Sequence, residues 1–184
     1  MPQLTIYPSL NDLPASLAYQ AHAFIRITWF DIFQYDLYGA MMPPEWHSTH
    51  ITISEENVLF AHGAVVWKPI HHAGQDYKCY GLSSVFTYPA FRKKGYGSQI
   101  VQAATSYIQQ DPHADLAILW TSPQLEPFYG QFGWKHMPNT IIHLGEPEHP
   151  RTDDGYIMML FLSKKAQVAY DTFIQTPIYF GAGW

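Results

Sequence analysis

The sequence predicts a single α/β domain over residues 1–184 with a mixed sheet, and three observations carry this prediction. The chain is 47% hydrophobic and 16% aromatic, as expected of a packed globular protein. Runs with strand character alternate with segments of helical periodicity along its length. No internal repeat, linker or charge block divides it. The expected order is strand, helices, three strands, helix, strand, helix, strand.

The first elements combine a strand with helices. Residues 4–7 predict a short strand ended by Pro8. Asn11–Pro14 indicates a helix start, because a capping residue is followed closely by proline. Apolar residues then keep helical spacing to about Trp29, and aromatic-rich residues 31–38 indicate a second short helix.

Three strands are expected next. Residues 50–53 alternate as a strand, 54–57 form a turn, and 58–67 form the second strand. Residues 70–76 are predicted as a polar loop and 77–86 as the third strand.

The remaining elements follow a central helix that ends at Asp111-Pro112. Residues 116–120 predict a buried strand and 124–131 a short helix. Residues 136–154 are expected to be loop with one apolar stretch at 141–144. Gly155–Leu162 is the final strand, and the aromatic tail 176–184 is expected to pack down.

A basic, glycine-punctuated turn links the third strand to the central helix. Strand, turn and helix in this order place free backbone N–H groups and the positive end of a helix dipole at one point, as in a phosphate site. A dinucleotide-binding loop would need glycine where Ile100 stands, and the Gly-Lys-Ser/Thr of a P-loop is absent. A simple turn before a helix stays open as an alternative.

Composition excludes several classes of protein. A net charge of −5 with ten Lys plus Arg argues against a general nucleic-acid binder. Cys79 is the only cysteine, so neither an intramolecular disulfide nor a Cys-based zinc site is expected. His71 and His72, with Asp76 nearby, could bind a metal ion, but adjacent histidines in a loop between strands usually point apart, so we expect no metal site there. We expect no membrane contact and, without a signal peptide, a cytoplasmic location.

Two motifs in order resemble the GNAT (Gcn5-related) N-acetyltransferases. The first is Arg92-x-x-Gly95-x-Gly97 before a helix, and the second is the segment Phe128–Trp134 after a strand. The resemblance covers about residues 57–135. It implies the acyl-CoA N-acyltransferase fold, with a mixed, mostly antiparallel sheet of about 6–7 strands flanked by helices, and acetyl-CoA as the acyl donor.

A narrower resemblance is to the aminoglycoside 2-prime N-acetyltransferase branch. It rests on His62–Val66, on Arg151–Gly155, on Glu45-Trp46 where that branch has Asp-Trp, and on the terminal Trp184.

The family resemblance implies roles for individual residues. Main-chain groups of Val85, Phe86 and Thr87 would hold the pantetheine arm, one of them polarising the thioester carbonyl. Tyr129 matches the general-acid tyrosine, although a packed aromatic is the alternative on residue type alone. The pyrophosphate would be wrapped by the turn, that is by Arg92, Lys93, Lys94, Gly95, Tyr96, Gly97 and Ser98.

The predicted acceptor side departs from the branch. Ser83, with Ser84 beside it, stands where the branch places a Glu, and it can hold a water or bond the amine. Ala182 stands where the branch has an acidic residue. His47, His50, His62 and His143 are further candidate bases, each expected to be an ordinary surface or core histidine. The acceptor contacts that remain are Asp153, Asp154, Asp31, Trp120 and the terminal carboxylate of Trp184.

The predicted function is transfer of an acetyl group from acetyl-CoA to a primary amine of a small molecule, such as an aminoglycoside-like amine. The alternative is a catalytically weak or inactive acyl-CoA-binding sensor or interaction module, which Ser83 and Ala182 favour. A homodimer is a family-level expectation.

Overall fold

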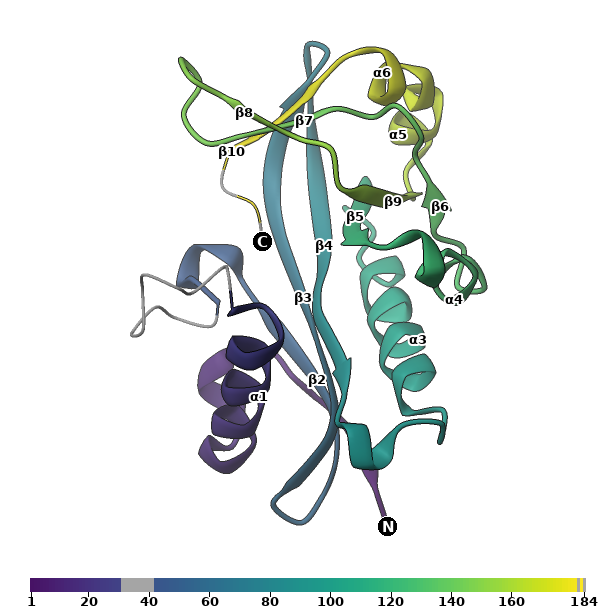
Figure 1. Cartoon of the computed structure of the whole chain (residues 1–184). Coiled ribbons are helices and arrows are strands. Elements are labelled where there is room, and N and C mark those ends of the chain that lie inside the picture. The colour runs from purple at the N-terminus through teal and green to yellow at the C-terminus, as the bar shows by residue number, and fades with distance from the viewer. Residues whose placement is uncertain (31–41, 182, 184) are drawn as a thin grey trace. The chain divides into compact units, whose positions relative to one another are not determined.

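The computed structural model describes residues 1–30, 42–181 and 183. Within them, a seven-stranded sheet has the order β1 (Gln3–Tyr7), β2 (Thr49–Glu55), β3 (Val58–His72), β4 (Gln75–Thr87), β5 (Leu116–Thr121), β9 (Tyr156–Phe161) and β6 (Lys135–His136) (Figure 1). A three-stranded sheet has the order β10 (Ile178–Gly181), β7 (Ile142–Leu144) and β8 (Arg151–Asp153). The pairs β1–β2, β2–β3, β5–β9 and β6–β9 are antiparallel and β4–β5 is parallel, so the predicted mixed, mostly antiparallel sheet is confirmed.

The described helices are mostly short. They are α1 (Ala15–Thr28), α3 (Tyr96–Gln109), α4 (Glu126–Gly130), α5 (Lys164–Val168) and α6 (Tyr170–Gln175). Single 3-10 turns are η1 (Leu10–Asp12), η2 (Pro44–Trp46), η3 (Pro89–Phe91) and η4 (Pro123–Leu125). None of the helices in this part of the chain is long and apolar enough to cross a membrane.

The chain forms two compact units. The first is Met1–Val66 with Ser84–Ala104, and the second is Trp67–Ser83 with Thr105–Trp184. The single domain expected from the sequence stays a prediction.

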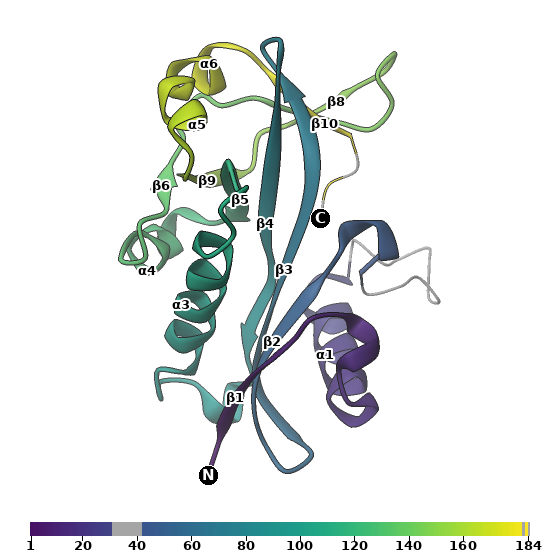
Figure 2. The same ribbon diagram turned by 180° about the vertical axis from the view of Figure 1, so that it is seen from behind.

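In the first unit, β1 lies along β2, as Figure 2 shows from behind, and β2 pairs with the first part of β3. Helix α1 begins after Pro14, as predicted, but no side chain caps it, because the expected capping residue Asn11 lies in η1; the helix buries one face through Leu17, Ala21 and Ile25. Two hydrogen bonds hold it: Gln20 donates to the Asn57 carbonyl (2.7 Å), and the Tyr88 hydroxyl donates to the Gln20 carbonyl (2.6 Å).

The second unit has its own apolar core. Strand β5 pairs with β9 along its whole length, from Leu116↔Phe161 to Thr121↔Tyr156. The buried side chains of this core include Ile70, Tyr77, Cys79, Leu116, Ile118, Ile142, Ile157, Phe173, Ile178 and Phe180.

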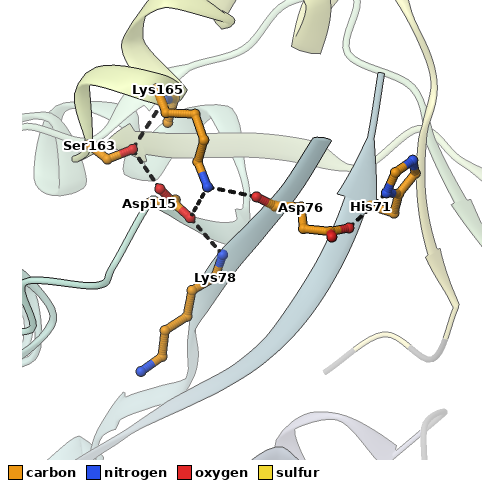
Figure 3. A network of polar contacts seen from close by, with 7 residues as sticks. His71, Asp76, Lys78, Asp115, Ser163 and Lys165 are labelled. Carbon is orange, nitrogen blue, oxygen red and sulfur yellow. Dashed lines mark hydrogen bonds and ion pairs between the residues drawn. The ribbon is translucent and has the colours of Figure 1, made fainter. Parts of the chain in front are cut away.

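A polar network at the edge of this core centres on Asp115 (Figure 3). Its carboxylate accepts from the Lys78 amide (2.9 Å) and the Ser163 hydroxyl (2.7 Å), and pairs with the Lys165 ammonium (2.8 Å). The Ser163 hydroxyl also accepts from the Ala166 amide and thereby caps α5. Asp115 therefore fastens β4, β5 and the start of α5 to one another.

Two expectations about elements are corrected, and two helices are added. The predicted loop 70–76 is a two-residue turn, because Ala73 and Gly74 both adopt positive φ (49° and 78°) and let β3 and β4 continue to it. The predicted loop 136–154 contains His136 of β6 and the strands β7 and β8. Each strand is too short to show a strand pattern in the sequence, and each is extended by its pairing: β6 with β9, β7 with β10, and β8 with β7. Helices α5 and α6 were not predicted. The helix expected at 31–38 lies outside the described residues.

Candidate functional site

The turn between β4 and α3 presents a row of backbone donors. Lys93 and Gly95 both adopt positive φ (62° and 78°), and the Gly95 carbonyl accepts the first helical bond, from Gln99. The amides of residues 93–98 donate to no other described residue. Because the first amides of a helix also carry the positive end of its dipole, this arrangement of donors is of the kind that suits an anion.

The side chains of the turn add positive charge and hold its shape. Arg92, Lys93 and Lys94 are exposed, and the Arg92 Nε donates to the Thr87 carbonyl (3.1 Å), which ties the turn to the end of β4. Phe91 stacks on Phe60 of β3 with centroids 3.9 Å apart. The predicted cofactor-binding residues Arg92, Lys93, Lys94, Gly95, Tyr96, Gly97 and Ser98 are therefore consecutive in a turn, exposed or half-buried, that is tied to Thr87.

Strand β4 loses its pairing with β5 after Gly81. Its parallel ladder with β5 ends at the pair Gly81↔Ile118, although β4 continues to Thr87. Ser84 adopts a positive φ of 51°, which strains a residue with a side chain. Val85 and Thr87 are half-buried and Phe86 is buried. The strand thus bends where the sequence predicts main-chain contacts to a pantetheine arm.

Tyr129 lies on α4 in the second unit, and 7% of its side chain is exposed. Burial raises the pKa of its hydroxyl to about 12. The hydroxyl forms no hydrogen bond with another residue in the described part of the chain. A buried ring with a protonated, unengaged hydroxyl is suited to donate a proton or hydrogen bond to a ligand.

Two predicted acceptor contacts, Trp120 and Asp153, meet in the second unit. The Trp120 indole N–H donates to Asp153 Oδ1 (3.2 Å), and the Gly155 amide donates to the same oxygen (2.8 Å). A Cβ on Gly155 would lie 2.8 Å from both Asp153 Oδ1 and Trp120 Cδ1, so only glycine fits there. Asp154 is exposed beside them.

The remaining predicted site residues differ in their exposure, and some of them lie outside the described residues. Ser83 is half-buried in β4 and has partners of its own. Asp31 and Trp184, and with them the Ala182 position, lie outside the described residues. His47 is exposed and His143 is half-buried on β7.

The histidine candidates contain a feature that the sequence reasoning missed, a buried pair. His50 Nδ1 lies 3.1 Å from His62 Nε2, and burial lowers the pKa of His50 to about 4. Burial, and then the neighbouring His50, lower the pKa of His62 to about 3. The signal in the sequence is two strands of alternating pattern with a histidine on the same face of each.

His71 and His72 point apart, as expected. His71 bonds the exposed Asp76 (2.7 Å), and His72 is buried against Phe173. Over residues 1–30, 42–181 and 183, no three His, Cys, Asp or Glu side chains gather as metal ligands.

Comparisons with known proteins bear on these observations. The model of the family described as "Acetyltransferase (GNAT) domain" matches residues 40–137, more than half of the chain. A search of the curated proteins found no match.

Solved structures share the fold. Escherichia coli ElaA is 16% identical with a TM-score of 0.58, over 86% of this chain and 99% of its own. The GNAT family N-acetyltransferase YhbS from Escherichia coli, in complex with CoA, is 12% identical with a TM-score of 0.57, over 90% and 83%. A GNAT family acetyltransferase from Brucella melitensis, in complex with acetyl-CoA, is 18% identical with a TM-score of 0.52, over 88% and 89%. The predicted fold is therefore confirmed.

Proposed function

The chain belongs to the acetyltransferase (GNAT) domain family, and from this premise we propose that it transfers an acetyl group from acetyl-CoA directly to a primary amine of a small molecule. The observation that carries the proposal is the turn from β4 into α3, where the amides of residues 93–98 donate to no other described residue and three cationic side chains lie beside them. Such a surface suits the pyrophosphate of CoA. Two of the similar structures contain CoA or acetyl-CoA.

In the proposed reaction, the end of β4 would stabilise the negative charge that develops on the thioester oxygen. The amine nitrogen attacks the thioester carbonyl carbon, a C–N bond forms, and the carbonyl oxygen becomes negative. A backbone N–H from the Val85–Thr87 segment would stabilise that oxygen, a contribution of about 3 kcal/mol for one oxyanion-hole donor. The interrupted ladder of β4 supports this role, because groups not engaged by β5 can face a ligand.

Tyr129 would act as the general acid. When the C–S bond breaks, the departing thiolate needs a proton or a strong hydrogen bond. The high pKa of about 12 keeps the Tyr129 hydroxyl protonated at neutral pH, so it can supply either. The proton that the amine loses would leave through a water held by Ser83, since a serine hydroxyl is not itself a base near neutral pH.

We propose that the acceptor is a cationic amine that binds beside Asp153 and Trp120. Asp153 Oδ1 is already occupied by two donors, which orients the carboxylate and leaves its second oxygen for an ammonium group. Aminoglycosides are one class that fits, with Asp154 as a second contact. The proposal keeps Asp31 and the terminal carboxylate of Trp184 as further contacts to the acceptor. It also keeps a homodimer and a cytoplasmic location.

The test begins with calorimetric titration of acetyl-CoA, followed by turnover with a panel of primary amines that includes an aminoglycoside. CoA release is measured with a thiol reagent. The protein's own thiol should not react with this reagent, because Cys79 is fully buried and burial raises the pKa of its thiol. We expect binding and turnover with at least one amine. No binding at millimolar acetyl-CoA would refute the proposal, and binding without turnover on any amine would support the sensor alternative.

A further inference from the structure

A chain of buried hydrogen bonds runs from β2 through β3 to the bend of β4, within the first unit. Ser48 Oγ lies 3.1 Å from His50 Nε2, His50 Nδ1 lies 3.1 Å from His62 Nε2, and His62 Nδ1 lies 3.1 Å from the Ser84 carbonyl oxygen. Both imidazoles are fully buried, and Ser48 is 8% exposed. Strand register explains the meeting: Thr52 pairs with His62, so His50, two residues before Thr52, lies on the same face and diagonal to His62.

The direction of every bond in this chain follows from its last member. A carbonyl oxygen only accepts, so His62 Nδ1 carries a proton and donates to Ser84. In a neutral ring His62 Nε2 must then accept, which makes His50 Nδ1 a donor and His50 Nε2 an acceptor for the Ser48 hydroxyl. The lowered pKa values keep both rings neutral at pH 7, so one tautomer of each satisfies all the contacts.

The end of this chain holds the strained part of β4. A positive φ strains a residue with a side chain, and such a conformation persists only where its surroundings fix it. His62 does so at two points: its Nδ1–H binds the Ser84 carbonyl, and its ring stacks on Phe86 with centroids 5.4 Å apart. Phe86 is backed in turn by Phe24 of α1, at 4.2 Å.

We propose that His62 is a positioning residue for acyl transfer, held in the tautomer that the Ser84 carbonyl requires, and that the contacts with His50 and Ser48 support that tautomer. By fixing Ser84 and Phe86, His62 orients the peptide groups between them, which include the amides assigned to the thioester carbonyl. The inference rests on the proposed function. In this proposal the buried histidines position the strand and do not act as the general base. His62 Nδ1 is unsuited to be a base because it carries a proton and donates it to the Ser84 carbonyl.

The test compares His62→Asn with His62→Leu, two side chains of nearly the same shape. Both remove the ring and its stacking on Phe86, but only asparagine keeps an N–H close to the position of Nδ1. We expect kcat of His62→Leu to fall about tenfold or more, since one lost bond of 1.4 kcal/mol corresponds to tenfold, and that of His62→Asn to stay within about threefold of wild type. Acetyl-CoA affinity should stay unchanged in both, because the pyrophosphate turn is untouched.

Each outcome bears on the proposal. Equal kcat for His62→Leu and wild type, or equal losses in the two variants, would overturn the inference while leaving the proposed function intact. A wild-type protein that acetylates no amine overturns the proposed function instead, and the inference with it. If either variant fails to fold, the tautomer of His62 in the wild-type protein provides a second test. Nitrogen NMR of its histidines should find the proton on Nδ1 of His62, and a proton only on Nε2 would overturn the inference.

Discussion

Replacing Asp115 with asparagine should destabilise the protein far more than the same change at Asp76, although both carboxylates belong to the network in Figure 3. Asp115 is 9% exposed and accepts from the Lys78 amide and the Ser163 hydroxyl as well as pairing with Lys165. The Asp76 carboxylate is 86% exposed and bonds only to His71, itself 67% exposed, among the described residues. Lys165 reaches the Asp76 main-chain carbonyl, which the substitution keeps.

The magnitude follows from the donors left without an acceptor. An asparagine at 115 retains one carbonyl oxygen and can satisfy Ser163, but its NH2 group then faces the Lys78 amide and the Lys165 ammonium. A hydrogen bond to a charged group contributes about 1.5–3 kcal/mol, and a half-exposed ion pair at most about 1 kcal/mol. We expect a loss of about 3 kcal/mol for Asp115→Asn, and of no more than about 0.5 kcal/mol for Asp76→Asn.

Urea unfolding followed by tryptophan fluorescence measures both values, and pH supplies a second check. Burial opposes ionisation of Asp115, but the hydrogen bonds from Lys165, Ser163 and Lys78 outweigh it and hold its pKa below the usual value. The stabilisation is therefore full above the unfolded pKa, near 3.9, and is lost as pH falls through the folded pKa. The gap between wild type and Asp115→Asn should close at that acidity. A loss below 1 kcal/mol at pH 7, or one equal to that of Asp76→Asn, would refute the reasoning.

Three further predictions concern the site. Tyr129→Phe should lower kcat by about a hundredfold with acetyl-CoA affinity and urea midpoint unchanged, because the hydroxyl has no partner to lose among the described residues; an unchanged kcat would remove Tyr129 from the mechanism. Gly95→Ala should cost about 1 kcal/mol of stability, because Gly95 has a φ of 78°, and should weaken acetyl-CoA binding in calorimetry. Gly63→Ala should cost about 1–3 kcal/mol, because the added Cβ would lie 2.6 Å from Ile100 Cγ2, but should leave acetyl-CoA binding unchanged. Equal effects of the two on binding would contradict the placement of the turn. Since the pKa values of His50 and His62 are lowered to about 4 and about 3, the unfolded chain binds protons below pH 6.5 that the folded chain does not, so stability should fall by roughly 3 kcal/mol from pH 6.5 to 5, and His50→Asn should roughly halve this fall.

The sequence was informative wherever a structural feature depends on a short continuous segment. The turn of residues 92–98 could be predicted because its glycines, cations and following helix are all local in the chain. The helix start at Pro14 and the helix end before Pro112 were predictable for the same reason, since proline restricts its own neighbours.

Features that depend on pairing across the sheet could not be predicted. His50 and His62 meet only because β2 and β3 pair in one register, and a shift by one residue would place them on opposite faces. Asp153 was selected from a local motif, but its orientation depends on Trp120, 33 residues earlier. The helix start at Ser163 was missed although its capping bond from Ala166 is local; the bond that fixes the same hydroxyl to Asp115, 48 residues earlier, depends on the fold.

The division of the chain into two compact units has a consequence for how the protein can be cut. The boundaries fall after Val66, Ser83 and Ala104, which lie inside β3, β4 and α3. Every fragment that isolates one unit would therefore sever two strands and a helix in mid-length and leave their backbone groups without partners. Limited proteolysis of the native protein should release no stable fragment that ends at these three points.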